Sequence, residues 1–216
     1  MFVDILPPRG LEVLDLLSAT LPMERFYLAE GTGLALQLGH RESYDLDFFS
    51  QAAFDTFDII QALSVAGHFR LTGEAIGTVH GFLNDVRVTF LHYPYGLLFP
   101  PTAFNRISIA DPRDIGLMKI TAISGRGSKK DFIDLRFISR QVIPLESLFG
   151  LMEKKYLGVD YSEYHLIRSL AYFDDADREP DPIMRSGVSW SETKDYFRAQ
   201  QRSLIRKYLR PDDIGS

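Results

Sequence analysis

The sequence contains no cysteine among its 216 residues. Disulfide bonds, thiol nucleophiles and cysteine-rich zinc sites are therefore excluded, and the absence is typical of proteins in a reducing compartment. The N-terminal MFVDILPPRG lacks the charged start and apolar run of a signal peptide, and no uncharged apolar stretch of about 18 residues occurs. We therefore expect a cytoplasmic protein with no membrane partner.

Positive charge is also in short supply. Lys and Arg total 24 against 29 Asp and Glu, which gives a net charge of -5. This balance argues against a protein that coats nucleic acid nonspecifically. Hydrophobic residues make up 45% of the chain and aromatic residues 12%, which is enough to bury a sizeable core.

The first half of the sequence mixes helical and strand-like patterns. Apolar spacing and helix-end residues predict helices at 11–21, 32–38 and 56–66. Period-two patterns predict strands at 25–30, 43–49, 68–72, 75–82, 85–93 and 107–110. The strands at 68–72, 75–82 and 85–93 are expected to form an antiparallel meander.

The second half is helical. Helices are predicted at 112–124, 130–140, 145–157, 161–173 and 190–209, the last with a capping box formed by Ser189 and Glu192. The order of elements predicts an α+β fold, in which a small mixed sheet with flanking helices is followed by a C-terminal helical lobe. We place the domains at 1–110 and 111–216.

Asp45 and Asp47 form the strongest local signal for chemistry, because they lie two residues apart in an apolar strand. Alternate strand residues point to the same face, so the two carboxylates are expected to lie close together. Oxygen ligands at this spacing suit Mg²⁺ or Mn²⁺. The alternative is that both side chains lie on the solvated face of an edge strand.

Gly31 and Thr32 precede this strand. A glycine lets backbone amides approach a phosphate, and a helix that begins at Thr32, with Thr32 as its cap, would direct its positive N-terminal dipole there. The alternative is that Gly31 simply makes a turn.

Three segments resemble motifs of a known family. The first is YLAEGTGLALQLGHRESYDLDFFS at 27–50, the second is DIGLMKITAISGRGSKKDFIDLRFI at 114–138, and the weaker third is VRVTFLHYPYGLL at 86–98. In this order they resemble the AbiEii/AbiGii toxin family of polymerase-β-like nucleotidyltransferases. Glu30 departs from the family pattern, which commonly has a small residue there.

The resemblance implies which residues form the site. Gly31 and Thr32 would seat phosphates, Asp45 and Asp47 would hold Mg²⁺ or Mn²⁺, and the helical lobe would add Lys119 and Asp134 to complete the active-site cleft. Without the resemblance, Lys119 would be interpreted as a lysine at the margin of an apolar stripe whose ammonium reaches solvent.

Other candidates have simpler explanations. Asp131 is a candidate for substrate binding, although helix capping or structural pairing also explains it, and Lys130 is placed to pair with Asp134. Arg87 is a candidate phosphate contact or an ordinary exposed arginine. Many polymerase-β-like enzymes carry a third carboxylate on a neighbouring strand, but here Thr89 lies mid-strand and Asp85 only at the strand's start.

The last helix carries a basic stripe, Lys194, Arg198, Arg202 and Arg206, which is either a solvated face or a docking surface for RNA or an acidic antitoxin. No GxxxxGK[ST], HExxH or GxSxG motif is present.

Together with the Asp45/Asp47 pair, the resemblance implies a metal-dependent nucleotidyltransferase that transfers a nucleotide from a nucleoside triphosphate to an RNA or protein hydroxyl. The resemblance implies the toxin of a toxin-antitoxin or phage-defence pair, restrained by an antitoxin. The alternative is a nucleotide-binding or protein-interaction module without turnover.

Overall fold

The computed structural model describes residues 1–209 and divides into two compact units, Met1–Asp111 and Pro112–Ser216. The first unit contains all seven strands of the described residues together with three α-helices, and the second is helical. The predicted α+β fold class is confirmed.

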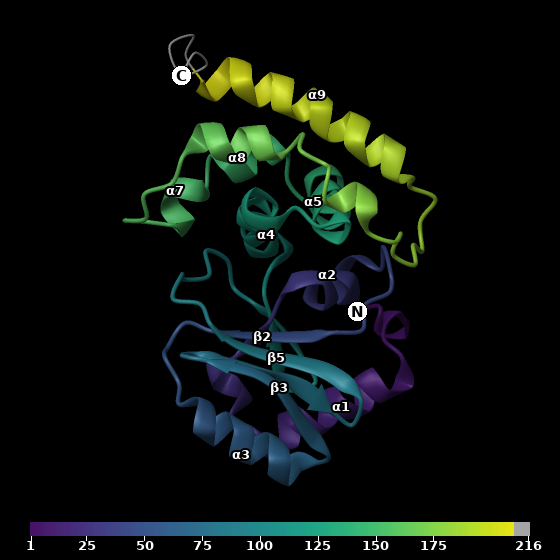
Figure 1. The fold of residues 1–216 in the computed structure, drawn as a ribbon, viewed down its shortest axis with the longest axis vertical. Helices are drawn as coiled ribbons and strands as arrows, with labels where there is room; N and C mark the ends of the chain where they lie inside the picture. The colour runs from purple at the N-terminus through teal and green to yellow at the C-terminus, as the bar shows by residue number, and fades with distance from the viewer. Residues whose placement is uncertain (210–216) are drawn as a thin grey trace. The chain divides into compact units, whose positions relative to one another are not determined.

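A mixed sheet forms the centre of the first unit (Figure 1). Its strands lie in the order β3-β4-β5-β2-β1-β7-β6. The pairs β2–β5 and β1–β7 are parallel, and β1 and β2 are antiparallel. The strands are β1 (Tyr27–Leu28), β2 (Leu46–Ser50), β3 (Phe69–Ala75), β4 (Thr78–Leu83), β5 (Val86–His92), β6 (Thr102–Phe104) and β7 (Ile107–Ile109).

The predicted meander is confirmed, because β3 pairs with β4 and β4 with β5, both antiparallel. Asn84 and Asp85 connect β4 to β5 in a tight turn, and both adopt positive φ angles that asparagine and aspartate tolerate. The short strand β6 was not predicted, since it follows a Pro-rich loop and has only three residues.

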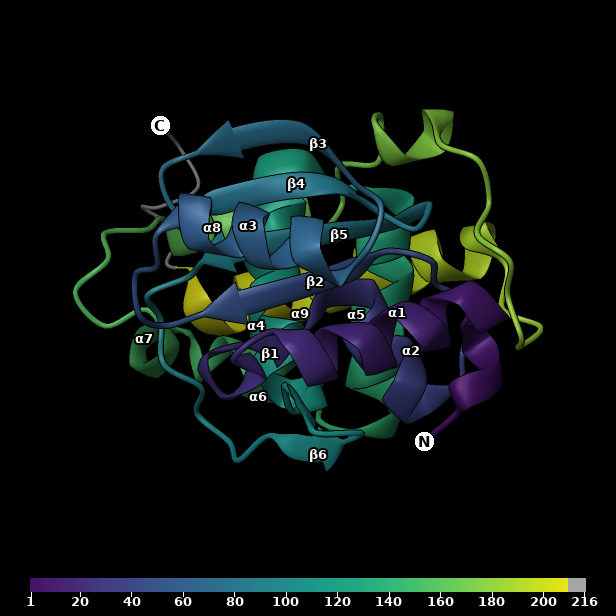
Figure 2. The same ribbon diagram turned by 90° about the horizontal axis from the view of Figure 1, so that it is seen from below.

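Helices α1 (Pro8–Thr20) and α3 (Thr56–Ala66) cover one face of the sheet, as Figures 1 and 2 show. Their apolar sides pack on alternate residues of β2 and β5, which point to that face. The buried residues of this core include Leu14, Leu17, Leu46, Phe48, Leu63, Val88 and Phe90. Helix α2 (Glu30–Leu38) lies on the other face, in contact with β2.

The second unit contains six α-helices among the described residues: α4 (Pro112–Arg126), α5 (Lys129–Gln141), α6 (Leu145–Phe149), α7 (Met152–Lys155), α8 (Glu163–Ser169) and α9 (Trp190–Tyr208). The prediction of one helix over 145–157 was wrong, because the first helix ends at Gly150 and α7 begins two residues later. Helix α8 is also shorter than predicted. The capping box of Ser189 and Glu192 at the start of α9 is confirmed.

The core of the second unit centres on Phe132, whose ring contacts those of Phe173, Trp190 and Phe197. A second feature is a fully buried ion pair between Lys155 and Asp114, with Nζ 2.7 Å from Oδ1. The apolar core of this unit thus encloses the charges of Lys155 and Asp114, which neutralise each other.

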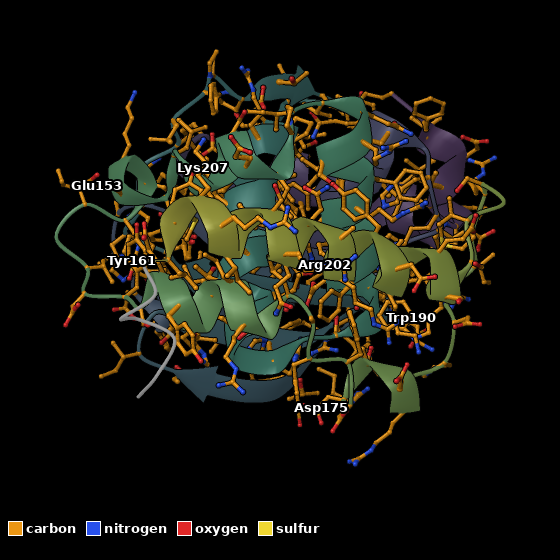
Figure 3. The ribbon with its side chains drawn as sticks, turned by 90° about the horizontal axis from the view of Figure 1, so that it is seen from above. Glu153, Tyr161, Asp175, Trp190, Arg202 and Lys207 are labelled. Carbon is orange, nitrogen blue, oxygen red and sulfur yellow. The ribbon has the colours of Figure 1, made fainter. Side chains whose placement is uncertain are left out.

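Helix α9 runs from Trp190 to Lys207 across Figure 3, with Arg202 between them. Two members of its basic stripe are engaged within the unit: Lys194 pairs with Asp177 and Arg198 with Asp195. Arg202 and Arg206 are exposed. Across residues 1–209, every helix is too short or too polar to cross a membrane.

Candidate functional site

Asp47 lies on the sheet face opposite α1 and α3, and Asp45 lies just before the strand that carries it. Strand β2 begins at Leu46, so Asp45 precedes the strand instead of lying inside it as predicted. Leu46 and Phe48 are fully buried in the core. Alternation therefore directs Asp47 to the other face, and both aspartates are half-buried.

Thr32 has a different local role from the one predicted. Helix α2 begins at Glu30, with Ala29 as its N-cap and no side-chain cap, so the assignment of Thr32 as the cap was wrong. Glu30, the first residue of the helix, has a positive φ of 55°, which is uncommon for a residue with a side chain. Thr32 is buried in the first turn, where its Oγ1 is 2.6 Å from Ser43 Oγ and is also hydrogen bonded to the carbonyl oxygen of Asp45. These bonds tie α2 to the segment that carries the carboxylates.

Gly31 lies against the guanidinium group of Arg41. A Cβ placed on Gly31 would lie 2.2 Å from one guanidinium nitrogen, so Arg41 would have to shift to admit a side chain at this position. Arg41 is 2% exposed, and its other nitrogen donates to the carbonyl oxygen of Glu42 over 2.9 Å. A buried cation thus contacts the first turn of α2, whose free amides already favour an anion.

Arg41 was missed from the sequence. The signal was a single arginine between a helix that ends at Gly39 and the acidic strand. Arginine is usually exposed, and the sequence alone did not reveal that the chain folds this one back onto Gly31.

Thr89 lies beside Asp47 where a third carboxylate was sought. The two residues are paired in the parallel register of β2 and β5, and Thr89 is paired in turn with His80 of β4. His80 Nδ1 is 3.2 Å from Thr89 Oγ1. Arg87 is exposed on the same face of β5, two residues before Thr89.

Asp85 does not provide the third ligand. It lies in the β4–β5 turn, where its carboxylate pairs with Arg9 of α1 over 3.0 Å. No cluster of three or more His, Asp or Glu side chains suited to a metal ion occurs among residues 1–209. The candidate metal-binding carboxylates are therefore Asp45 and the neighbouring Asp47.

Lys119, Asp131 and Asp134 form a buried group in the second unit. Lys119 Nζ, on α4, lies 2.6 Å from Asp131 Oδ1 and 3.4 Å from Asp134 Oδ2, both on α5. The other oxygen of Asp131 accepts a hydrogen bond from Ser128 Oγ over 2.8 Å. Ser128 is also the N-cap of α5.

This geometry excludes one alternative and corrects one prediction. The alternative of a lysine that reaches solvent is excluded for Lys119, since Lys119 is 2% exposed and α5 packs against α4. The ion-pair partner of Asp134 is Lys119, while Lys130 is exposed. The candidate residues thus fall into two groups, one on the sheet and α2, and one between α4 and α5.

The family comparison uses one curated relative. No family model matches the chain. The uncharacterized protein aq_aa25 of Aquifex aeolicus is 36% identical over 189 residues, covering 85% of this chain and 88% of the relative. The chain belongs to the same family as aq_aa25. Such identity over most of both chains indicates a common fold for this family.

Three solved structures resemble this member of the aq_aa25 family. MenT4, the nucleotidyltransferase toxin Rv2826c of Mycobacterium tuberculosis, superposes with a TM-score of 0.62, over 93% of this chain and 82% of that one. JHP933 of Helicobacter pylori gives 0.54 over 94% of both chains. A further nucleotidyltransferase structure from Helicobacter pylori, itself described as putative, gives 0.53 over 93% and 96%.

All three structures are 15% identical to this chain. At that identity the likeness establishes that this chain shares the fold of these structures, and it leaves the activity to be argued from the site. The narrower AbiEii/AbiGii resemblance remains a prediction.

Proposed function

We propose that this protein is a nucleotidyltransferase that transfers a nucleotide from a nucleoside triphosphate to a hydroxyl group of RNA or protein. The observation that carries the proposal is the placement of Asp47 on the sheet face opposite α1 and α3, with Asp45 two residues before it and α2 tied to the same segment through Thr32. Carboxylates for a cation and helix amides for phosphates are thereby brought to one part of the fold.

The donor set fits a divalent cation. Mg²⁺ is commonly held by one or two carboxylates and takes substrate phosphates and water as its remaining ligands. Asp45 and Asp47 meet that requirement, whereas a closed metal site would need more protein ligands. When bound, Mg²⁺ or Mn²⁺ would neutralise charge on the triphosphate.

Gly31 and Thr32 are proposed to seat the phosphates through their backbone amides. Because α2 begins at Glu30, these amides belong to the first turn and have no partner within the helix. The Arg41 guanidinium against Gly31 adds a positive charge at this end of α2. Arg87, exposed on the same face as Asp47, is a further phosphate contact in this proposal.

Lys119, Asp131 and Asp134 enter the proposal through the family resemblance. Lys119 would neutralise developing charge on the phosphates, and Asp134 would orient Lys119 or the acceptor. Their ion pairs support an orienting role, since two carboxylates fix the ammonium group. The proposed role of Asp131 changes from substrate contact to support of Lys119.

The biological part of the proposal is that of a toxin restrained by an antitoxin. Its support is the fold shared with MenT4, which is described as a nucleotidyltransferase toxin. The antitoxin partner and the role in phage defence are supported by the AbiEii/AbiGii resemblance alone. Coexpression with neighbouring genes, followed by a growth assay, tests this part separately.

A second candidate is a nucleotide-binding module without turnover. It is favoured by Thr89, which stands where a third carboxylate was sought, and by the carboxylate partners that already neutralise Lys119. The two candidates differ in one measurable result. A module would bind triphosphate with Mg²⁺ but release no pyrophosphate.

The test uses the full chain, Mg²⁺, each of the four α-labelled nucleoside triphosphates and total bacterial RNA. We expect label from at least one triphosphate on RNA or on protein, and none when the metal is chelated. Metal-dependent binding without any transfer would support the module, and equal binding with and without chelator would reject both candidates.

A further inference from the structure

His80 lies in a row of side chains that begins at the proposed metal-binding pair. Asp47 of β2, Thr89 of β5, His80 of β4 and Gly73 of β3 are successive register partners across four strands. Their neighbours Leu46, Val88 and Val79 are buried. The row therefore lies on the face that carries Asp47.

We propose that His80 is the general base that accepts the proton of the acceptor hydroxyl, and that Thr89 is a positioning residue that orients its ring. The proposal rests on the proposed nucleotidyl transfer, for which it identifies a residue that no sequence motif indicated.

The order of strands places His80 on the acceptor side of the carboxylates. The phosphate-seating amides of α2 follow β1, which lies on one side of β2, whereas β5 and β4 lie on the other side. A triphosphate that reaches from α2 to Asp47 would leave the side toward His80 for the attacking hydroxyl. Two strand spacings separate the backbones of Asp47 and His80, roughly 9 to 10 Å.

The environment of the ring suits a base. Thr89 is 2% exposed, so its hydroxyl is fixed, while His80 is half-buried. Gly73, beside the ring, has no side chain. A Cβ added there would lie 3.6 Å from His80 Cδ2, so the glycine leaves space next to the ring. If Nδ1–H donates to Thr89 Oγ1, the lone pair of Nε2 is left for the acceptor.

The charged groups around His80 in this unit come from three strands. Asp47 lies two strands away, Arg87 is on β5 two residues before Thr89, and Arg70 of β3 stacks over Phe82, two residues after His80. Glu74 is engaged by Thr56 of α3. The two arginines favour a phosphate group nearby.

In the proposed step the acceptor O–H bond breaks and its proton passes to His80 Nε2. The acceptor oxygen forms a bond to the α-phosphorus, and the bond from that phosphorus to the bridging oxygen breaks, so pyrophosphate leaves with its electron pair. The imidazolium then loses the proton to water. Atoms and charge balance without a further reactant.

The test compares His80→Gln with His92→Gln in the full chain, with Mg²⁺, α-labelled triphosphates and total bacterial RNA. His92 is the matched control because alternation along β5 directs it to the opposite face from Thr89. His80→Gln should lower kcat by about 10²- to 10⁴-fold, the usual contribution of a general base, without changing triphosphate affinity. His92→Gln should retain the wild-type rate.

Rescue separates a base from a structural residue. In His80→Gly, added imidazole should restore transfer, because the free base can occupy the vacated space. Thr89→Ser should transfer nearly as wild type, whereas Thr89→Val should lose about tenfold in kcat and nothing further in the His80→Gln background. Thermal unfolding of each variant verifies that it is folded.

A magnetic resonance readout tests the tautomer without turnover. In ¹⁵N-histidine-labelled protein, the signal lost in His80→Gln identifies His80, and we expect a proton on Nδ1 that moves to Nε2 in Thr89→Val. A wild-type rate in folded His80→Gln, or an Nε2–H tautomer in the wild type, would overturn the inference. Absence of transfer in the wild type would instead reject the proposed function on which it rests.

Discussion

Lys119 Nζ lies 2.6 Å from Asp131 Oδ1 in a group of three charges that is closed to solvent. Asp134 approaches the same ammonium to 3.4 Å. A lysine held by two carboxylates is oriented before any substrate arrives. Its removal would take away the ammonium group that both carboxylates contact.

Lys119→Ala is therefore expected to reduce stability as well as transfer. Breaking a buried pair from one side costs about 3 to 5 kcal/mol, because an uncompensated charge remains. Urea unfolding of the wild type and the variant measures the difference. Lys130→Ala is the control, since Lys130 is exposed on the same helix as Asp131. A loss as small as that of the control would show that the ion pairs do not support the fold.

Gly31→Ala should weaken both folding and triphosphate binding. The new Cβ would lie 2.2 Å from the Arg41 guanidinium, so the arginine or the first turn of α2 must shift, at a cost of about 1 to 3 kcal/mol. Gly125→Ala is the matched control, because nothing lies within 4 Å of a Cβ there. Calorimetric titration with triphosphate and Mg²⁺ measures the affinity of both variants. Equal triphosphate affinity in the two variants would exclude a role of Gly31 and the neighbouring Arg41 in phosphate binding.

Thr32→Val should loosen the segment that carries Asp45. The change removes a buried hydroxyl that bonds to Ser43 and to the Asp45 carbonyl, and each such bond contributes about 0.5 to 1.5 kcal/mol. Thr72→Val on the exposed strand β3 should be nearly neutral. Unfolding curves compare the two variants, and hydrogen exchange at Leu46 reports on the local effect. Identical curves would assign no structural role to the Thr32 hydroxyl.

Asp177 should make the stability of the second unit depend on pH. Hydrogen bonds from Lys194 and Trp190 lower the pKa of its carboxyl below the ordinary 3.8. A lowered folded-state pKa stabilises the fold above the unfolded value and loses that effect as pH falls through the folded value. The wild type should therefore have a higher melting temperature than Asp177→Asn at neutral pH, and this difference should disappear in acid. A pH-independent difference between the two melting temperatures would contradict this.

The sequence predicted the parts of the fold that depend on local patterns. The burial of Leu46 and Phe48 agrees with the predicted alternation, which directs Asp47 to the opposite face, and the strand patterns before and after Asn84 predicted the meander. The prediction of a single helix over 145–157 was wrong, because α6 ends before Gly150 and α7 begins only at Met152.

Relationships between distant residues could not be predicted in the same way. The pairing of Thr89 with Asp47 and His80 depends on strand register, which no local pattern in β2 or β5 specifies. The burial of Lys119 could not be predicted, because the apolar stripe of α4 does not indicate which element packs beside it. The carboxylates of α5 make that position the interior of the unit.

The central claim is that Asp45 and Asp47 support metal-dependent nucleotidyl transfer. The most direct measurement is transfer of α-labelled nucleotide to total RNA by the wild type and by Asp47→Asn, with thermal unfolding to verify the fold. We expect Mg²⁺-dependent label with the wild type and a loss of at least about 100-fold in Asp47→Asn, as when one preorganised charge-stabilising group is removed. Equal labelling by a folded Asp47→Asn variant would contradict the account.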